Sequence, residues 1–292
     1  MSSDYDIKID FYSDWIDILR NRLLSLGYNV EPDEKPQDIS IRYFNLRKRL
    51  VSPFPRNVLK SKEFNCPEEN IAGLDMLIEK IKNGEDLRPY LSRSISNLDF
   101  DDLLLNDWGI YHLHLGTTLD KDEFVSRTRN VIFVRLDEKN AYLIDVMPHR
   151  KWACQNLVRI VHRNWPHTID KYRIKDAVRV NEKLSDEQIY QARKAGVFLL
   201  IEVEEGAVYM PIGGGIATSG TSIDVVRVSD YYADRVKALE NVIKENIADF
   251  VIGVQEAGIK VGGKLKFRFA IRGKEVVAFE TTTNVGLILG EL

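Results

Sequence analysis

The sequence predicts an α+β fold: a helical N-terminal part, a central mixed or antiparallel sheet with a basic helix, and a smaller αβ C-terminal part. Apolar residues recur every three or four positions over residues 9–26 and again after Pro67, which is typical of amphipathic helices. From Gly109 onward, short runs alternate between apolar and polar residues, which is typical of strands. These patterns follow one another along the chain, as they do in α+β proteins.

The places where the pattern changes divide the chain into three predicted regions. Residues 1–105 are predicted as a helical N-terminal region, residues 106–183 as a histidine-bearing sheet core with a basic helix, and residues 184–292 as a C-terminal αβ region. Of the 292 residues, 44% are hydrophobic and 29% are charged. This composition is ordinary for a globular protein that buries a sizeable core.

The N-terminal region contains helical patterns, one short strand pattern and a basic stretch. Helices are predicted over residues 9–26, from Pro67 to near Gly84, and over residues 96–106. A strand is predicted over residues 39–44. The stretch 42–62 holds seven basic residues and no acidic residue, and its prolines at 53 and 55 keep it extended or turned. This stretch could be an arm that touches phosphates or a solvated connector.

The rest of the chain alternates between strand and helix signals. In the core, strands are predicted over residues 110–115, 131–136 and 141–146, and a helix over residues 151–164. In the C-terminal region, helices are predicted from Ser185 to near Gly196 and from Ser229 to near Asp249. Strands are predicted there over residues 197–203, 207–212, 223–228, 264–271, 275–280 and 285–289.

All five histidines of the chain lie between residues 112 and 167. In a strand over residues 110–115, His112 and His114 point to the same face, with backbones roughly 6–7 Å apart. Imidazole is the side chain best suited to proton transfer near neutral pH. We therefore expect His112, His114 and His149 to act as catalytic acid and base, with Arg127 (or Arg129) as the cation that stabilises a phosphate.

Three other interpretations of these residues stay open. His-x-His on a strand can present two imidazoles to zinc, iron or manganese, although residue 118, where a glutamate ligand would be expected, is Thr. The histidines could instead be half-buried and hydrogen bonded for packing. A carboxylate site built from Asp145, Glu202 and Glu204 is the weakest option. We favour proton transfer and expect no metal or other cofactor.

A basic stretch with interleaved aromatic residues follows His149. Residues 149–179 hold eight lysines and arginines against two aspartates, in a chain whose net charge is −3. Cations beside aromatic rings are what a protein uses to hold a nucleic-acid backbone and stack bases. The predicted nucleic-acid-binding residues are Arg150, Lys151, Arg159, His162, Arg163, Trp165, Lys171 and Arg173. A solvated helix face is the alternative.

Several short runs carry a resemblance to known families over about residues 105–170. These runs are His112-Leu-His-Leu-Gly116, Arg127-Thr128, Val131-Ile-Phe133, Tyr142-Leu-Ile-Asp145, His149 and Asn164-Trp-Pro166. Together they resemble uncharacterised bacterial proteins of mobile elements and defence islands that share an HxHLG core. The strand-rich core with its His and Arg residues also loosely resembles metal-independent ribonuclease toxins of the barnase, EndoU and RelE type. The resemblance implies a toxin or anti-phage setting.

We therefore expect a metal-independent nuclease, acting on RNA rather than DNA, with a possible protein partner. One alternative is a non-catalytic nucleic-acid-binding or assembly subunit of a defence or mobile-element system, and another is a His-ligated metal hydrolase. The two cysteines, Cys66 and Cys154, have no ligand spacing, which favours a reducing cytoplasm. No run approaches the ~18 apolar residues of a membrane span, so no membrane partner is expected.

Overall fold

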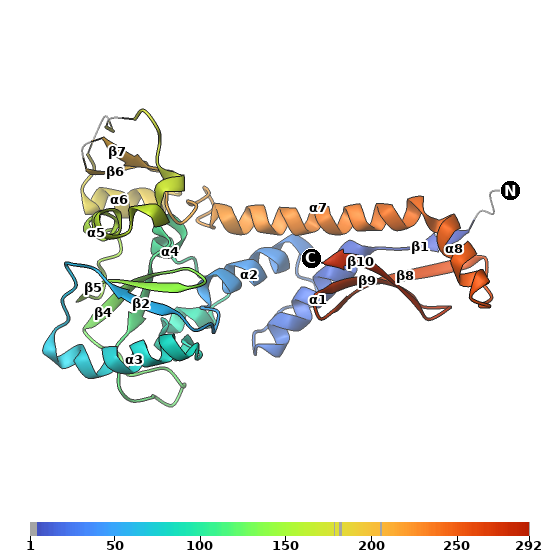
Figure 1. The fold of residues 1–292 in the computed structure, drawn as a ribbon, viewed down its shortest axis with the longest axis horizontal. Helices are drawn as coiled ribbons and strands as arrows, with labels where there is room; N and C mark the ends of the chain where they lie inside the picture. The colour runs from blue at the N-terminus through green and yellow to red at the C-terminus, as the bar shows by residue number, and fades with distance from the viewer. Residues whose placement is uncertain (1–4, 178, 181–182, 205, 292) are drawn as a thin grey trace. The chain divides into compact units, whose positions relative to one another are not determined.

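The computed structural model describes residues 5–177, 179–180, 183–204 and 206–291. Helices and mixed sheets make up the fold, which confirms the predicted α+β class (Figure 1). The chain forms two compact units: residues 1–43 with 227–292, and residues 44–226. Among the described residues, no helix is long and apolar enough to cross a membrane.

The first unit joins the two ends of the chain in one sheet. Its four strands have the order β1-β8-β9-β10, with β1 parallel to β8 and the other pairs antiparallel. The strands are β1 (Asp6–Lys8), β8 (Lys264–Arg272), β9 (Glu275–Glu280) and β10 (Val285–Glu291). Its helices are α1 (Phe11–Ser25), α8 (Ile247–Glu256) and most of α7 (Ile223–Glu245), together with the first part of α2 (Pro36–Arg49).

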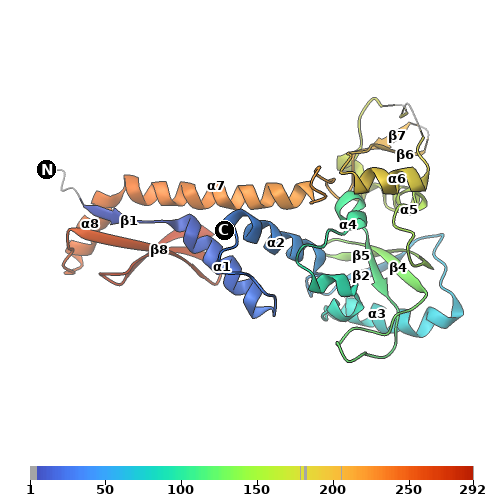
Figure 2. The same ribbon diagram turned by 180° about the vertical axis from the view of Figure 1, so that it is seen from behind.

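The second unit is built on a mixed sheet of order β2-β5-β4-β3, seen from behind in Figure 2. β2 runs parallel to β5, and the other pairs are antiparallel. The strands are β2 (Asn57–Lys60), β3 (Tyr111–His114), β4 (Asn130–Leu136) and β5 (Asn140–Pro148), and β6 (Ile201–Glu204) pairs separately with β7 (Ala207–Tyr209). Its helices are α3 (Ile71–Asn83), α4 (Leu103–Trp108), α5 (Asn156–Asn164) and α6 (Asp186–Lys194).

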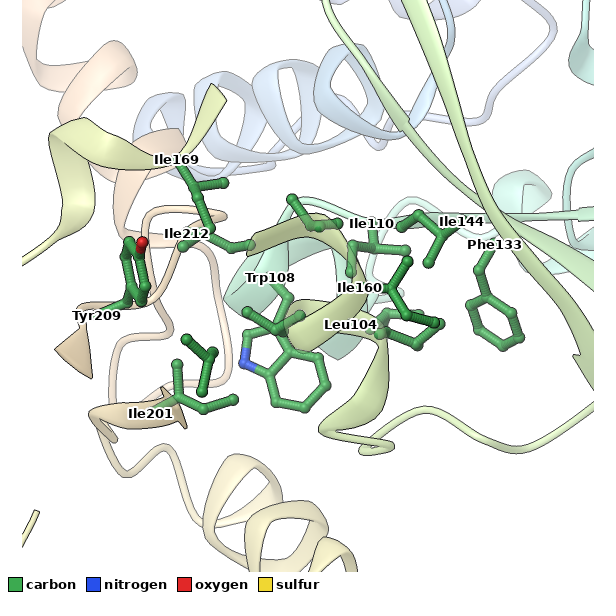
Figure 3. Close-up of a cluster of buried hydrophobic side chains, with 14 of the residues drawn as sticks. Leu104, Trp108, Ile110, Phe133, Ile144, Ile160, Ile169, Ile201, Tyr209 and Ile212 are labelled. Atoms are coloured by element: carbon green, nitrogen blue, oxygen red, sulfur yellow. The ribbon is translucent and has the colours of Figure 1, made fainter. Parts of the chain in front are cut away.

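One hydrophobic core joins the parts of the second unit (Figure 3). Trp108 and Ile110 lie between the central sheet and the β6–β7 pair, and both are almost completely buried. Phe133 and Ile144 bring the sheet into the same core, and Ile201 brings β6. Residues from both sides of the predicted boundary near residue 183 therefore share one core.

The two compact units do not follow the three predicted regions. The predicted boundaries near residues 105 and 183 both fall inside the second unit, and the predicted helical N-terminal region contains β1 and β2. In the first unit, the backbone N–H of Phe269 donates to the carboxylate of Asp14 at 2.7 Å, a contact between residues 255 positions apart. Local sequence patterns extend over a few residues, so they contain no signal for such pairings.

Two predicted strands are helical in the structure. Residues 39–44 lie inside α2, where Ile39, Tyr43 and Leu46 are buried at spacings of four and three residues. The strand predicted over residues 223–228 is the start of α7, and Ser229 is buried within this helix and does not cap it. A short apolar run fits the two-residue period of a strand as well as the 3.6-residue period of a helix. In both segments, buried residues recur at helical spacing over a longer stretch than the short run, and this longer pattern is that of a helix.

Predictions that rest on local turn and cap chemistry are confirmed. Ser185 and Gln188 form a capping box at the start of α6. The β4–β5 and β8–β9 hairpins form where the alternation and the turn residues predict them. Two helix starts are wrong: the helix predicted over residues 96–106 is α4, shifted to 103–108, and the helix predicted from residue 151 begins at Asn156.

Candidate functional site

The antiparallel sheet brings three histidines together. His112 and His114 lie on β3, and His149 follows the end of β5, where its backbone N–H donates to the carbonyl of Arg129 at 3.0 Å. The ring centroids lie 6.5 Å apart for His112 and His114, 6.1 Å for His112 and His149, and 5.5 Å for His114 and His149. The sheet topology thus juxtaposes the three residues that the sequence analysis selected for proton transfer.

A cavity of about 320 Å³ lies against this cluster and is called the histidine pocket below. Two of the predicted catalytic imidazoles, those of His112 and His149, line it, and so does the predicted cation Arg127. His114 and Arg129 are not among its lining residues. The other lining residues are Ser92, Ser94, Phe100, Asp101, Asp102, Leu103, Leu104, Trp152, Tyr190 and Arg193.

Trp152 packs directly on the two imidazoles of the pocket. Its ring centroid lies 4.4 Å from that of His112 and 4.7 Å from that of His149. The indole excludes water from one side of each imidazole, which strengthens electrostatic interactions inside the pocket. In the sequence, Trp152 is one of the aromatic residues interleaved in the basic stretch and is expected to point inward on the helix predicted over residues 151–164. No local signal indicates that it turns toward β3.

The carboxylate of Asp102 lies close to Nδ1 of His112. Only 8% of His112 is exposed, and its Nδ1 lies 3.7 Å from Oδ2 of Asp102. Burial lowers the pKa of His112, and the nearby charge of Asp102 opposes that effect. Asp102 is itself fixed in place, because its carboxylate caps α4 by accepting from the backbone N–H of Leu105 at 3.0 Å.

The pKa values of the other two histidines are also lowered. Burial, together with the nearby His112, His149 and Arg127, lowers the pKa of His114 to about 4. The pKa of His149 is lowered by burial and by His112, Arg127 and Arg150. The free protein therefore holds a cluster of neutral imidazoles at neutral pH, the form in which an imidazole can accept a proton.

Two of these histidines have a ring nitrogen that makes no hydrogen bond to the surrounding residues that the structure describes. The Nδ1 atoms of His112 and His114 are buried, and neither has a hydrogen-bond partner within the described part of the chain. Histidines kept for structure are expected to have their buried ring nitrogens hydrogen bonded. This observation counts against the interpretation in which the histidines only support the sheet.

Arg193, on α6, is a pocket residue that the sequence analysis missed. Its guanidinium is 1% exposed, pairs with Asp107 at 2.6 Å and lies 3.8 Å from the ring centroid of Trp108. It also donates to the backbone carbonyl of Trp152. A single arginine on a polar helix gives no local signal, because its partners come from α4 and from the loop after β5.

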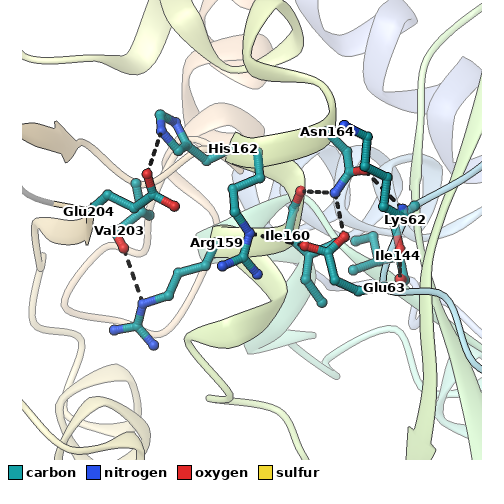
Figure 4. A network of polar contacts seen from close by, with 11 residues as sticks. Lys62, Glu63, Ile144, Arg159, Ile160, His162, Asn164, Val203 and Glu204 are labelled. Atoms are coloured by element: carbon teal, nitrogen blue, oxygen red, sulfur yellow. Dashed lines mark hydrogen bonds and ion pairs between the residues drawn. The ribbon is translucent and has the colours of Figure 1, made fainter.

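Most of the predicted nucleic-acid-binding face of α5 makes internal contacts (Figure 4). Arg163 pairs with Glu63 at 3.0 Å, and Arg159 donates to the carbonyl of Val203 at 3.2 Å. His162 lies 2.8 Å from the hydroxyl of Tyr209. These contacts connect α5 to the loop after β2 and to β6 and β7, so they account for these residues without a ligand.

Trp165, Lys171 and Arg173 are also engaged in the protein. Trp165 is 8% exposed and packs in the core, with its ring centroid 5.1 Å from that of Tyr142. It cannot stack on a base, which corrects the prediction for this residue. Arg173 donates to the carbonyl of Gly206 at 3.1 Å, and Lys171 lies over the ring of Tyr172. Arg150 and Lys151 are exposed beside the histidine pocket.

The residues of the alternative metal and carboxylate sites do not form a ligand cluster. No group of three or more His, Cys, Asp and Glu side chains in the described ranges is arranged to hold a metal ion. Glu202 pairs with Lys183 at 2.9 Å, and Asp145 accepts from the backbone N–H of Asn65 at 3.0 Å. These two carboxylates therefore have structural partners on different sides of the unit.

Comparison of the chain with protein-family models, with curated proteins and with solved structures gives no match. The resemblance of the HxHLG run to defence-island proteins and to ribonuclease toxins therefore stays a prediction.

Proposed function

We propose that the protein is a metal-independent ribonuclease that uses the histidine pocket for acid–base catalysis. The observation that carries the proposal is the convergence of His112, His149 and Arg127 on one cavity of about 320 Å³. Cleavage of RNA without a metal needs a base for the 2′-hydroxyl proton, an acid for the leaving oxygen and a cation for the phosphate. These three residues are of the types that this reaction requires.

The proposed reaction is an internal transesterification. Neutral His112 takes the proton of the 2′-hydroxyl, and the 2′-oxygen forms a bond to phosphorus while the bond from phosphorus to the 5′-oxygen breaks. Protonated His149 gives its proton to the departing 5′-oxygen, so the products are a 2′,3′-cyclic phosphate and a 5′-hydroxyl. Arg127 stabilises the negative charge that develops on the phosphoryl oxygens.

The environments of the two histidines support this division of roles. His112 is more buried than His149 and faces Asp102, whose charge stabilises the imidazolium that forms when His112 accepts a proton. His149 is only partly buried, so it can exchange protons with solvent between turnovers. A bound phosphodiester raises the pKa of His149, because a negative charge favours the imidazolium.

RNA is favoured over DNA because the attacking group is the 2′-hydroxyl, which DNA lacks. The proposed toxin or anti-phage setting and the protein partner rest on the resemblance of the HxHLG run alone, and the proposed cytoplasmic location rests on the spacing of the two cysteines. They add nothing to the chemistry and can be tested separately from it.

The proposal is tested with a labelled single-stranded RNA and the DNA of the same sequence, each incubated with the purified chain in excess chelator. We expect cleavage of the RNA to 2′,3′-cyclic phosphate ends and no cleavage of the DNA. His112→Ala and His149→Ala should each lower the rate by about 100-fold or more. His167→Ala is the matched control, because His167 is exposed and does not line the pocket.

Absence of RNA cleavage by the unchanged protein would overturn the ribonuclease proposal, and so would either of two other results. One is cleavage by His112→Ala and His149→Ala at the rate of the unchanged protein. The other is equal cleavage of RNA and DNA, which the 2′-hydroxyl mechanism does not allow.

A second candidate function is binding of nucleic acid without cleavage. The observation that favours it is the burial of the two histidines of β3: His112 is 8% exposed and His114 is 5% exposed. Exposed Arg127, Arg150 and Lys151 would then hold phosphates at the rim. This candidate predicts RNA binding that weakens steeply with salt and no cyclic phosphate product in the same assay.

A further inference from the structure

A second cavity of about 560 Å³ lies beside the histidine pocket. Trp152 and Tyr190 line both cavities, so the two are neighbours that share an aromatic wall. The remaining lining residues of the second cavity are Arg150, Lys151, Ala153, Cys154, Asp186 and Glu187. We call this cavity the Trp152–Tyr190 subsite.

The shared wall presents two aromatic rings from different elements. Trp152 lies in the loop after β5, where Arg193 fixes its backbone carbonyl, and Tyr190 lies on α6. Both residues are only partly buried. Aromatic rings that stay accessible beside a phosphate-handling site are suited to stacking with nucleobases, because every base has a π face.

Two cations line the subsite at the point where the chain comes from the histidine cluster. Arg150 and Lys151 follow His149 in sequence, and both are exposed. Neither forms an ion pair with any residue that the structure describes. Arg150 has a φ of 80°, in the left-handed region that non-glycine residues rarely adopt. Such backbone strain clusters at ligand-binding sites, where the surrounding structure maintains it.

Two carboxylates complete the rim on the side of α6. Asp186 accepts from the backbone N–H and the side-chain amide of Gln155, and Glu187 accepts from the side-chain amide of Gln191 at 2.6 Å. Both carboxylates keep further lone pairs. They disfavour a phosphate on this side, and they can accept from the exocyclic amino group of a base.

We propose that the Trp152–Tyr190 subsite binds a nucleobase of single-stranded RNA next to the scissile phosphate. The base stacks on the shared aromatic wall, and Arg150 and Lys151 hold the adjoining phosphate. The carboxylates of Asp186 and Glu187 select bases with an exocyclic amino group over uracil. The identity of the ligand as RNA rests on the proposed ribonuclease function, and the subsite itself rests on the second cavity.

The subsite is tested by binding, because binding does not depend on cleavage. Fluorescence anisotropy is measured with 2′-O-methyl oligonucleotides, which cannot undergo the transesterification. The single strand should bind at least about 10-fold more tightly than the duplex, whose bases are not free to stack on the protein. An oligo(U) strand should bind more weakly than an oligo(C) or oligo(A) strand of equal length.

Tyr190→Leu should weaken binding of the single strand by about 10-fold, and Tyr190→Phe, which keeps the ring, should leave it within about twofold. A second measurement covers the case in which Tyr190→Leu does not fold. Oligonucleotide binding should quench tryptophan fluorescence in the unchanged protein, and Trp152→Phe should remove that part of the quenching. Equal affinity of Tyr190→Leu and Tyr190→Phe, or quenching that is as large in Trp152→Phe as in the unchanged protein, would overturn the subsite.

The two proposals fail in different ways. Binding that depends on Tyr190 without any RNA cleavage contradicts the ribonuclease and supports the subsite. RNA cleavage that needs His112 and His149, together with binding that is indifferent to Tyr190 and to strandedness, supports the ribonuclease and contradicts the subsite.

Discussion

The imidazoles of His112, His114 and His149 influence one another because their ring centroids lie within 6.5 Å of each other. Burial lowers the pKa of all three histidines, and the charge of His112 lowers the pKa of His114 and of His149 as well. At neutral pH the lowered pKa values keep this cluster neutral. Under the proposed function, a bound phosphate would raise these pKa values, so we expect substrate binding to be coupled to proton uptake.

The lowered pKa of His114 makes the stability of the protein depend on pH. The pKa is about 4 in the folded state against 6.5 for an ordinary histidine, so the unfolded chain binds more protons between these pH values. The contribution of His114 to the free energy of unfolding is therefore fully present above pH 6.5. It is lost as the pH falls toward 4, and the loss is on the order of 3 kcal/mol. Urea unfolding at pH 7.5 and pH 5 measures the larger part of this loss, about 2 kcal/mol.

His114→Gln is the matched variant for this pH dependence. A glutamine does not titrate, so the variant should lose less stability than the unchanged protein between pH 7.5 and pH 5. An equal loss in both proteins would show that other groups cause the dependence and that His114 titrates normally.

Asp102 has two separable tasks, as the cap of α4 and as the charge beside His112. Asn caps helices as well as Asp, so Asp102→Asn should change the free energy of unfolding by less than about 1 kcal/mol. The same change removes the charge that favours the imidazolium of His112. We expect RNA cleavage to fall by roughly 10-fold or more, with the acid limb of the pH–rate profile moved to lower pH.

The comparison of Asp102→Asn with Asp102→Ala separates the two tasks. The alanine variant should lose stability as well, by about 1 kcal/mol, because the N–H of Leu105 loses its partner. An Asn variant with an unchanged pH–rate profile would mean that Asp102 acts only as a helix cap.

At the scale of elements, local chemistry could be predicted and long-range partners could not. The strand that carries His112 and His114, the β4–β5 hairpin and the α6 capping box all follow from patterns within a few residues. The Arg193–Asp107 pair joins residues 86 positions apart, and no residue near either of them indicates the other. For this reason the sequence analysis found the histidines of the pocket and missed its buried arginine.

The close approach of α3 to the end of β3 depends on Gly73. A Cβ atom at this position would lie 1.9 Å from the carbonyl oxygen of Leu115, the residue after His114. Gly73→Ala must therefore displace α3 or the histidine strand, and overpacking of this kind costs about 1–3 kcal/mol. Thermal and urea unfolding measure the cost, and we expect RNA cleavage to fall with it.

Gly253→Ala is the matched control for this helix substitution. A Cβ at Gly253, in α8, has no heavy atom within 4 Å, so the alanine should stabilise the protein by roughly 0.5–1 kcal/mol. If both variants were stabilised alike, the packing of α3 against the histidine strand would be looser than the structure indicates.

At the scale of the whole molecule, the division into units follows contacts between the chain ends. Residues 1–43 belong with residues 227–292, because β1 pairs with β8 and α1 packs on the same strand. The candidate site lies entirely in residues 44–226. Sequence patterns show where helices and strands occur, but the grouping of elements into units is decided by burial between distant residues.

Asp14 offers a way to weaken the first unit without touching the candidate site. It is 5% exposed, accepts from the backbone N–H of Phe269 at 2.7 Å and pairs with Arg268 at 2.8 Å. Asp14→Ala leaves that buried N–H without a partner, at a cost of about 1–3 kcal/mol.

Hydrogen exchange in Asp14→Ala should become faster in α1 and β8 and stay unchanged in β3, β4 and β5. RNA cleavage at 25 °C should also stay unchanged. Faster exchange in all five elements would instead mean that the two units unfold together, so that the stability of the histidine pocket depends on the pairing of the chain ends.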